Sequence, residues 1–320
     1  MKVFATHNPD TKNRFQSSSG GIFTLLAERV IREGGVVYGA AFDASWAVVH
    51  RRVETLEGIA ALRGSKYVFS DFLGAVKDAM AYLEAGRRVL FSGTPCQVAA
   101  MRKRAGNNPR LLLVEVVCHG APRPEYWARY LDELCHAKGK TIADISAINF
   151  RDKSTGWRSY NFTVTFKDGT DISEHHGKNL YIKGFLLNYT LRRACFSCPF
   201  KYPEGSKADV SLGDFWGINK LAPQIQEGSG ISLVIARTNR GIDSLSEIDK
   251  AVEFDFEEIF RLHPALTQSA KMPARYDKAY MRLSNSKSII DVLRAITRTP
   301  LKLQIKIFIA SLLKINNRCE

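Results

Sequence analysis

Short apolar strands that alternate with helices over the first 120 residues constrain the fold of this chain most strongly. The strongest strand is Leu111–Val117, and Val36–Phe42 and Val89–Phe91 are further apolar runs. Helical patterns over 20–33 and 71–85 separate these strands, and glycines follow both helices. Strands of this kind are typical of a mainly parallel sheet that is covered by helices. We therefore expect ligands to bind where the parallel strands end.

The middle and the end of the chain have other patterns. Residues 144–150 and 160–167 indicate antiparallel strands. The predicted fold class is therefore α/β (mixed α+β): a mainly parallel sheet with helices, an antiparallel insertion and a helical C-terminal tail. We divide the chain into an N-terminal α/β region, 1–140, a second region, 141–285, and a basic helical tail, 286–320.

The composition is that of a globular protein with an unusual charge. The chain has 320 residues and a formal net charge of +14, which favours nucleic acid, anionic lipid, a phosphorylated cofactor or an acidic protein as a partner. Eleven Lys and Arg stand against three Asp and Glu in residues 271–320. An apolar stretch long enough for a signal peptide or a spanning helix is absent from the sequence, so we expect a cytoplasmic protein.

Six cysteines in a reducing compartment are more typical of metal ligands, catalytic groups or free thiols than of disulfides. Cys195-x-x-Cys198 is followed by Pro199, and this spacing lets two sulfurs reach one metal or cluster. Two more ligands are needed. We expect Cys135, within a helical stretch, to be an ordinary thiol, and Cys319, near the chain end, to be incidental.

Cys96 and Cys118 are the best candidates for the other two ligands. Thr94 and Gln97 fit a capping box with Pro95 at the first helical position, which places Cys96 in the first turn of a helix. Free amides and the helix dipole stabilise a thiolate there. Cys118 follows the strongest strand. Four cysteines suit zinc and a 4Fe-4S cluster equally by count, and packed thiols that bind nothing are the third interpretation.

Three loops have the composition of anion sites. Ser17–Gly21 precedes a helix, where hydroxyls and free amides suit a phosphate, although a simple serine cap explains it too. The loops 63–67 and 92–95 are similar, and neither a Walker A motif nor G-x-G-x-x-G is present. Asp214-Phe215-Trp216-Gly217 follows another strand, where these side chains line either a flat ring or a corner of the core.

Taken in order, seven motifs resemble those of the beta subunits of coenzyme F-420 hydrogenases and dehydrogenases. The resemblance runs from about residue 2 to about residue 275. The motifs are Ser-Ser-Ser-Gly-Gly-Ile-Phe (17–23), Gly-Ser-Lys-Tyr (64–67), Ser-Gly-Thr-Pro-Cys-Gln (92–97), Val-Cys-His-Gly (117–120), Phe-Arg-Asp-Lys with Gly-Trp (150–157), Cys-x-x-Cys (195–198) and Asp-Val-Ser-Leu-Gly-Asp-Phe-Trp-Gly (209–217).

This resemblance implies an iron–sulfur flavoprotein oxidoreductase that passes electrons between a 4Fe-4S cluster and FAD. The electrons go on to a hydride-type acceptor such as coenzyme F-420 or another small molecule, since relatives include reductases of chlorophyll-type pigments. The implied cluster ligands are Cys96, Cys118, Cys195 and Cys198. The implied flavin contacts are Ser18, Ser19, Gly20, Gly21, Ser65, Lys66, Thr94 and Gly120. Residues 1–140 would then form the flavin- and cluster-binding region.

Many relatives carry a ferredoxin-like segment of clustered cysteines before the serine–glycine loop, and this chain starts just upstream of that loop. We therefore expect ferredoxin, another electron-carrier protein or a partner subunit to supply electrons, and we expect no nucleic acid partner. The basic, apolar tail indicates contact with a membrane surface or a partner, or a terminal helix packed on the domain. The alternative function is a zinc-stabilised binding protein for an acidic partner, without redox activity.

Overall fold

The structure is a computed structural model that describes residues 1–202, 205–248 and 251–298. Its larger sheet has eight strands in the order β11-β1-β10-β9-β5-β4-β2-β3. Their bounds are β1 (Lys2–Thr6), β2 (Val36–Phe42), β3 (Val48–Val53), β4 (Val89–Gly93), β5 (Leu111–Val116), β9 (Val210–Asp214), β10 (Ser232–Ala236) and β11 (Val252–Phe254). The four central strands are parallel, and the strands on either side pair antiparallel.

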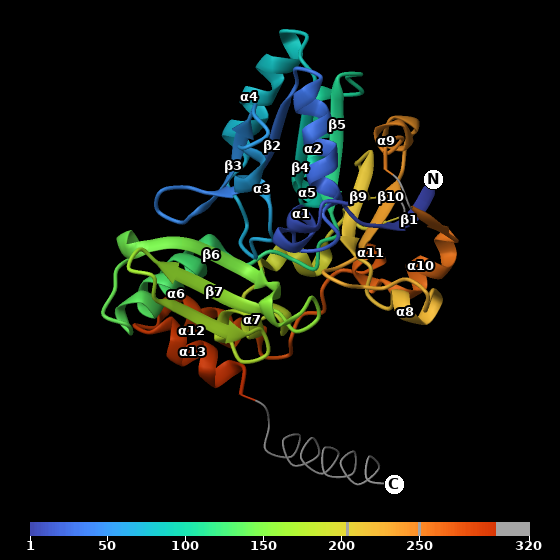
Figure 1. Ribbon diagram of the computed structural model, residues 1–320. Coiled ribbons are helices and arrows are strands. Elements are labelled where there is room, and N and C mark those ends of the chain that lie inside the picture. Colours follow the sequence, from blue (N-terminus) through green and yellow to red (C-terminus); the bar gives the residue numbers. More distant parts are fainter. Residues whose placement is uncertain (203–204, 249–250, 299–320) are drawn as a thin grey trace, which may run out of the picture.

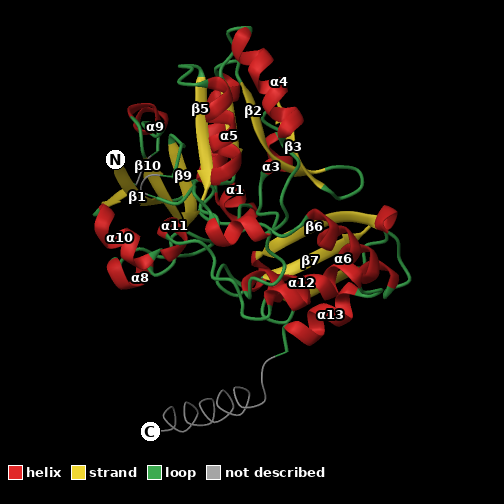
Figure 2. Ribbon diagram, turned by 180° about the vertical axis from the view of Figure 1, so that it is seen from behind, coloured by secondary structure: helices red, strands yellow, loops and turns green. Residues whose placement is uncertain are grey.

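Helices cover both faces of this sheet (Figures 1 and 2). One face packs against α2 (Ile22–Arg32) and α3 (Ile59–Leu62), because α2 turns its buried Ile22, Leu26 and Val30 toward the strands. The other face packs against α4 (Leu73–Glu84) and α5 (Pro95–Ala105). The central strands are thus buried on both sides, which explains their unbroken apolar sequences.

Shorter helices lie around the antiparallel end of the large sheet. A third core cluster joins β1 and β10 to the residues that surround them in α8, α10 and α11. The bounds of these short helices and their neighbours are α1 (Thr11–Gln16), α8 (Ile218–Leu221), α9 (Asn239–Ser244), α10 (Phe256–Leu262) and α11 (Pro264–Thr267).

The second sheet is small and antiparallel, in the order β6-β7-β8 (Figure 1). Its strands are β6 (Ile145–Asp152), β7 (Asn161–Phe166) and β8 (Asp171–His175), and its helices are α6 (Pro124–His136), α7 (Leu180–Leu186), α12 (Tyr276–Asn285) and α13 (Ile289–Ile296). An aromatic core of Trp127, Phe150, Phe162 and Tyr181 joins these elements. Three 3-10 turns complete the described elements: η1 (Ile142–Asp144), η2 (Lys153–Thr155) and η3 (Arg193–Ser197).

The predicted fold class is confirmed, including the antiparallel insertion. The strand Val36–Phe42 has the predicted bounds, and β8, β11 and α12 are additions that the sequence patterns did not predict. The division at residue 140 stays a prediction. In the structure the large sheet takes β9, β10 and β11 from 141–285, and the small sheet's core takes α6 from 1–140.

The predicted basic tail falls partly within the described residues. Its first helix, α13, packs on the small sheet's core through Ile289, Val292 and Leu293. Residues 299–320, with the predicted helix over 301–313 and Cys319, lie outside the described residues. Of the helices that are described, none is long and apolar enough to cross a membrane.

Candidate functional site

One edge of the large sheet gathers the predicted site residues. The parallel strands β4, β5 and β9 end at this edge, and β1 runs in the same direction. Thr94 follows β4, Cys118 follows β5, and the Ser17–Gly21 loop follows β1. The small sheet lies against the same edge (Figure 1). The site therefore occupies the position where ligands bind in open α/β sheets.

Cys96 lies in the first turn of α5, as predicted. The capping box is present, since the Thr94 backbone N–H donates to Gln97 Oε1 at 2.9 Å, and Pro95 opens the helix. Thr94 Oγ1 lies 3.1 Å from Cys96 Sγ. The start of this helix, with its positive dipole end, favours a thiolate or another anion at Cys96.

A β-bridge brings the Cys195–Cys198 loop to Cys118. Leu191 pairs with Pro122, and the Arg192 N–H donates to the carbonyl of Ala121 at 3.0 Å. Cys195 follows within η3, and the Cys198 N–H donates to Ser269 Oγ at 2.9 Å. Segments far apart in the sequence thus meet at one place.

The four candidate thiols are partly buried and close enough to influence one another electrostatically. Burial raises the pKa of Cys118 to about 12, Lys201 acts in the opposite direction, and the nearby Cys195 and Cys96 raise it further. Burial also raises the pKa of Cys195, whereas a hydrogen bond from Ala121 and the charge of Arg192 lower it. Uncompensated thiolates are therefore unfavourable here, and a bound cation would relieve the penalty.

Lys201 provides positive charge beside these thiols. Its Nζ donates to the carbonyl of Cys118 at 2.7 Å and to that of Ala265 at 2.6 Å. Within the described ranges, no three His, Cys, Asp or Glu side chains form a group that could hold a metal ion. Cys135 is fully buried in α6, apart from this site, as predicted for an ordinary thiol.

The serine–glycine loop is held closely against the sheet. Ser19 Oγ donates to the carbonyl of Ile231 at 2.8 Å and lies 3.2 Å from that of Gly213. A Cβ on Gly20 would lie 2.6 Å from the backbone N of Ser232, so only glycine fits. Gly21 has φ +87° and forms the N-cap of α2. Gly20 thus has a packing role in the described structure, and Gly21 a turning role.

The second loop of the predicted flavin set meets the first. The Ser65 N–H donates to Ser18 Oγ at 2.6 Å. Lys66 Nζ donates to the carbonyls of Arg63 at 2.8 Å and Gly64 at 3.2 Å, and burial lowers its pKa to about 7.

Two contacts join the flavin set to the cysteines. Gly213, which Ser19 contacts, faces Val117, the residue before Cys118: a Cβ on Gly213 would lie 2.8 Å from Val117 Cγ2. Tyr67, which follows Lys66, packs with Cys195 against one small apolar cluster. Gly120 lies against Leu191, near the same cluster. The structure therefore brings both predicted sets to one edge.

Two buried networks at this edge were not predicted. In the first, Gln97 Nε2 donates to Ser70 Oγ at 2.8 Å, and Ser70 Oγ lies 2.9 Å from Nδ1 of His50. His50 Nε2 lies 2.9 Å from the carbonyl of Ser92, and burial lowers the pKa of His50 to about 4. This network ties the start of α5, and hence Cys96, to β3. A histidine in a strand gave no sequence signal of this role.

In the second network, Arg151 at the end of β6 donates from Nη1 to Asp214 Oδ2 at the end of β9. Trp157 Nε1 donates to the other carboxylate oxygen at 3.1 Å. The Trp157 ring stacks on Trp216 with centroids 4.5 Å apart. The Asp214–Gly217 segment fits both of its interpretations, because Phe215 is buried in the core while Asp214 and Trp216 surround Arg151.

His119, the residue after Cys118, is partly buried. Its Nε2 lies 2.6 Å from Oδ1 of Asn188, a residue with φ +67°, and Asn188 Nδ2 donates to the carbonyl of Lys271. Burial lowers the pKa of His119, and the nearby Lys201 lowers it further, whereas the hydrogen bond with Asn188 raises it.

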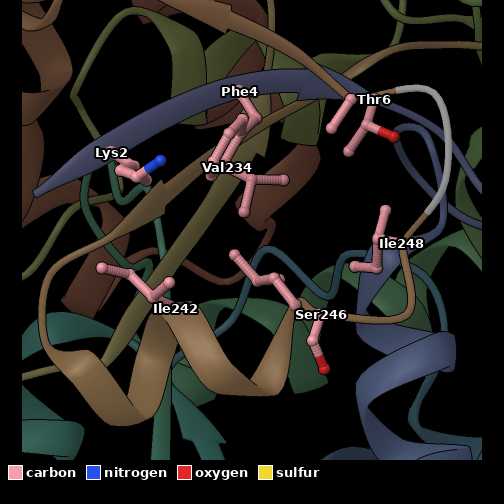
Figure 3. A pocket seen from close by; sticks show the side chains of 9 residues that line it. Lys2, Phe4, Thr6, Val234, Ile242, Ser246 and Ile248 are labelled. Atoms are coloured by element: carbon pink, nitrogen blue, oxygen red, sulfur yellow. The ribbon is translucent and has the colours of Figure 1, made fainter.

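Two cavities lie on the described part of the chain, and none of the predicted site residues lines either of them. One, of about 210 Å³, has a mostly apolar lining that includes Phe4, Val234 and Ile242, with Lys2 and Thr6 at its ends (Figure 3). It contains none of the predicted site residues. The other is a groove of about 580 Å³ beside Cys195, lined by Arg123, Pro124, Glu125, Arg192, Arg193, Ala194, Asp277, Tyr280 and Met281.

Comparisons with known proteins agree with this arrangement. Residues 86–261, more than half of the chain, match the family of the C terminus of the coenzyme F420 hydrogenase/dehydrogenase beta subunit. A chain of the F420-reducing NiFe hydrogenase complex from Methanosarcina barkeri has a similar fold, with a TM-score of 0.57 and 17% sequence identity. The similarity covers 90% of this chain and 94% of that one. No curated protein matches the sequence.

The family match covers β4, β5, β9 and β10 and all four candidate cysteines. It thus includes the ends of β4, β5 and β9 at the site, and it agrees with the resemblance seen in the motifs. The chain belongs to the coenzyme F-420 hydrogenase/dehydrogenase beta subunit family.

Proposed function

We propose that the protein is an iron–sulfur flavoprotein oxidoreductase. In this proposal Cys96, Cys118, Cys195 and Cys198 hold a 4Fe-4S cluster, and the loops with Ser18–Gly21, Ser65, Lys66, Thr94 and Gly120 hold FAD. The final acceptor is a hydride-type molecule such as coenzyme F-420 or another small molecule. A flavin exchanges both single electrons and hydrides, so a flavin beside a cluster connects one-electron and two-electron carriers.

The observation that carries this proposal is the convergence of four thiols from three separate segments. The pKa of Cys118 is raised by the nearby Cys195 and Cys96, and the pKa of Cys195 is raised by Cys96 and Cys198. Lys201 lies near Cys118, and Arg192 lies near Cys195. Each cysteine of a 4Fe-4S cluster binds a different iron, so its sulfurs surround the cluster rather than meet at one ion. The partly buried thiols, with cations and amides beside them, fit this requirement.

The chain's own residues have definite tasks in this mechanism. The dipole at the start of α5, together with Lys201, stabilises negative charge on the cysteine sulfurs. The bond from Ser65 N to Ser18 Oγ fixes the two candidate flavin loops relative to each other. Contacts of Gly213 with Ser19 and Val117 keep these loops next to Cys118. Side chains that surround Tyr67 and Cys195 exclude water between the two parts.

A protein electron carrier, such as a ferredoxin, is the partner that we propose. The structural neighbour from Methanosarcina barkeri belongs to a hydrogenase complex, which supports the idea that chains of this fold work with protein partners. The groove beside Cys195 carries three arginines, Arg123, Arg192 and Arg193, against two acids, Glu125 and Asp277. This charge balance suits an acidic partner.

Cofactor analysis of protein purified without oxygen tests the proposal. We expect about four irons and four acid-labile sulfides per chain, the content of one 4Fe-4S cluster. We also expect extractable FAD and broad absorbance at about 400 nm. Reconstitution with iron, sulfide and FAD in the same buffer controls for loss during purification. Colourless protein that holds one tightly bound zinc would instead identify the zinc-stabilised binding protein.

A further inference from the structure

Arg151 has the most incomplete set of hydrogen bonds among the buried charged side chains of the described residues. Only 4% of its side-chain surface is exposed, and its Nη1 donates to Asp214. Its Nε and Nη2 are both buried without a hydrogen-bond partner in the part of the chain that the structure describes. A buried donor without an acceptor is costly, and one on a charged group more so. Two such donors on one guanidinium indicate a missing acceptor.

The two free donors lie on the same edge of the guanidinium plane. Nη1 is the nitrogen on the side of Cδ, so Nε and Nη2 direct one N–H each, nearly parallel, to the opposite side. This edge matches two oxygens of one carboxylate or phosphate. Asp214 occupies the remaining nitrogen and also accepts from Trp157 at 3.1 Å, so its position is fixed from two sides.

The charges around Arg151 are also out of balance. Lys153 is buried two residues away, and its Nζ donates to three carbonyls, those of Arg14, Ser19 and Ser229. Burial lowers the pKa of Lys153 to about 7, and Arg14 and Arg151 both lie near enough to act on it. Among the described residues, Asp214 is the one acid that acts on it. A buried site with more cations than anions favours an additional anion.

Trp216 is the exposed ring next to Arg151. Among the rings around Arg151, Tyr160 and Trp157 are buried, whereas Trp216 is 39% exposed. The Arg151 guanidinium carbon lies 4.7 Å from the centre of the Tyr160 ring and 5.4 Å from that of Trp216. Because Nε and Nη2 are themselves buried, a ligand oxygen would reach the free edge only if the exposed Trp216 ring moved aside, at the junction of β6 and β9.

We propose that the Nε/Nη2 edge of Arg151 binds a carboxylate or phosphate group of a small molecule. This inference rests on the proposed function, because the two natural sources are a flavin phosphate and an acidic group of the hydride acceptor. Arg151 and Asp214 join the small sheet to the large one, so the anion would also hold the two sheets together at the site.

The test measures binding of anionic and neutral partners of the same ring to the full chain. Riboflavin is compared with flavin mononucleotide for the phosphate source, and nicotinamide with nicotinate for the carboxylate source. Tryptophan fluorescence and thermal midpoints are recorded at constant ionic strength. Wild type should prefer at least one anionic partner by about a hundredfold, the loss expected without two charge-assisted bonds.

Arg151→Lys keeps the charge near Asp214 but lacks the two parallel donors, so it should lose this preference. Arg158→Lys is the matched control, because Arg158 is an exposed neighbour that pairs with Glu227, and it should keep the preference. The pair that loses its preference identifies the source of the anion. Equal binding of anionic and neutral partners, or an unchanged preference in Arg151→Lys, would overturn the proposal and leave an ordered water as the partner of Arg151.

A second variant covers the case in which Arg151→Lys fails to fold. A variant that carries both Trp157→Phe and Trp216→Phe should lose most of the fluorescence change caused by the anion, because these two rings lie beside Asp214 and Arg151. Trp46→Phe, in the turn between β2 and β3, should retain the change. A change that survives in the double variant would contradict a site at Arg151. Because these measurements need neither turnover nor a cluster, their result is independent of the iron and sulfide analysis.

Discussion

The cysteine site and the Arg151 site lie at the same edge of the large sheet but are built in different ways. The four thiols are partly buried and sit in loops or in the first turn of a helix. Arg151 is buried and Asp214 is partly buried, and they lie at the ends of two strands from different sheets. The stability of the thiolates thus depends on what they bind, whereas the ion pair forms only where the two sheets pack together.

Loss of one cysteine should have the largest effect on the first of these sites. Cys195→Ser removes one of four proposed ligands, so iron and sulfide content should fall to near zero, measured by metal and sulfide analysis of anaerobic protein. Cys135→Ala is the control, because Cys135 is buried in α6, and its iron content should match wild type. Unchanged iron in Cys195→Ser would remove that residue from the ligand set.

Loss of Asp214 should have the largest effect on the second site. Asp214→Ala leaves Arg151 buried without its counter-ion, which should lower the free energy of unfolding by about 3–5 kcal/mol. Asp277→Ala breaks an ion pair with Arg193 whose side chains are 74% and 61% exposed, and should cost at most about 1 kcal/mol. Urea unfolding measures both. Similar losses in the two variants would mean that the buried pair has no special role.

The His50 network makes the cysteine edge sensitive to pH. Burial lowers the pKa of His50 to about 4, so between about 6.5 and 4 the unfolded chain binds a proton that the folded chain does not. Folding stability from this group is therefore complete above pH 6.5 and is lost as the pH falls toward 4, by up to about 3 kcal/mol. The measurement is urea unfolding from pH 7 to 4.

The control for this pH dependence is a second histidine. His136 is exposed on α6, so His136→Gln should keep the wild-type slope, whereas His50→Gln should flatten it. An equal slope in wild type and His50→Gln would show that His50 is not the group responsible.

Two glycines distinguish packing at the site from packing elsewhere. Gly20→Ala would bring a Cβ within 2.6 Å of Ser232 N and 2.8 Å of the Thr6 carbonyl, both rigid backbone, and should cost about 1–3 kcal/mol. Gly74→Ala in α4 meets nothing within 4 Å and should raise stability by up to about 1 kcal/mol. Thermal unfolding gives the sign of each change. A stabilising Gly20→Ala would contradict the close approach of the serine–glycine loop to β10.

Much of the fold was predictable because its signals are local. Apolar runs gave β2, β4 and β5, and the residues Thr94, Pro95 and Gln97 gave the start of α5. The short β11 was missed because three residues of strand carry little pattern. The helix α12 was missed although its buried Tyr276, Ala279 and Leu283 stand at helical spacing. The order of strands in the large sheet could not be predicted from the sequence. In the sheet β9 lies beside β5 and β10 beside β9, although both strands come about 100 residues after β5 in the chain.

The sequence by itself determined the candidate residues at the sheet edge: the paired cysteines, the thiol in a helix's first turn, and the serine–glycine loop. Spacing and capping are properties of neighbouring residues, so they can be recognised in the sequence alone. Only the tertiary structure decided that Cys118 meets Cys195 through the Leu191–Pro122 bridge, and that Arg151 meets Asp214. Burial and long-range pairing arise from the packing of distant segments, so they cannot be recognised in the sequence. This packing buries two donors of Arg151 without an acceptor among the described residues.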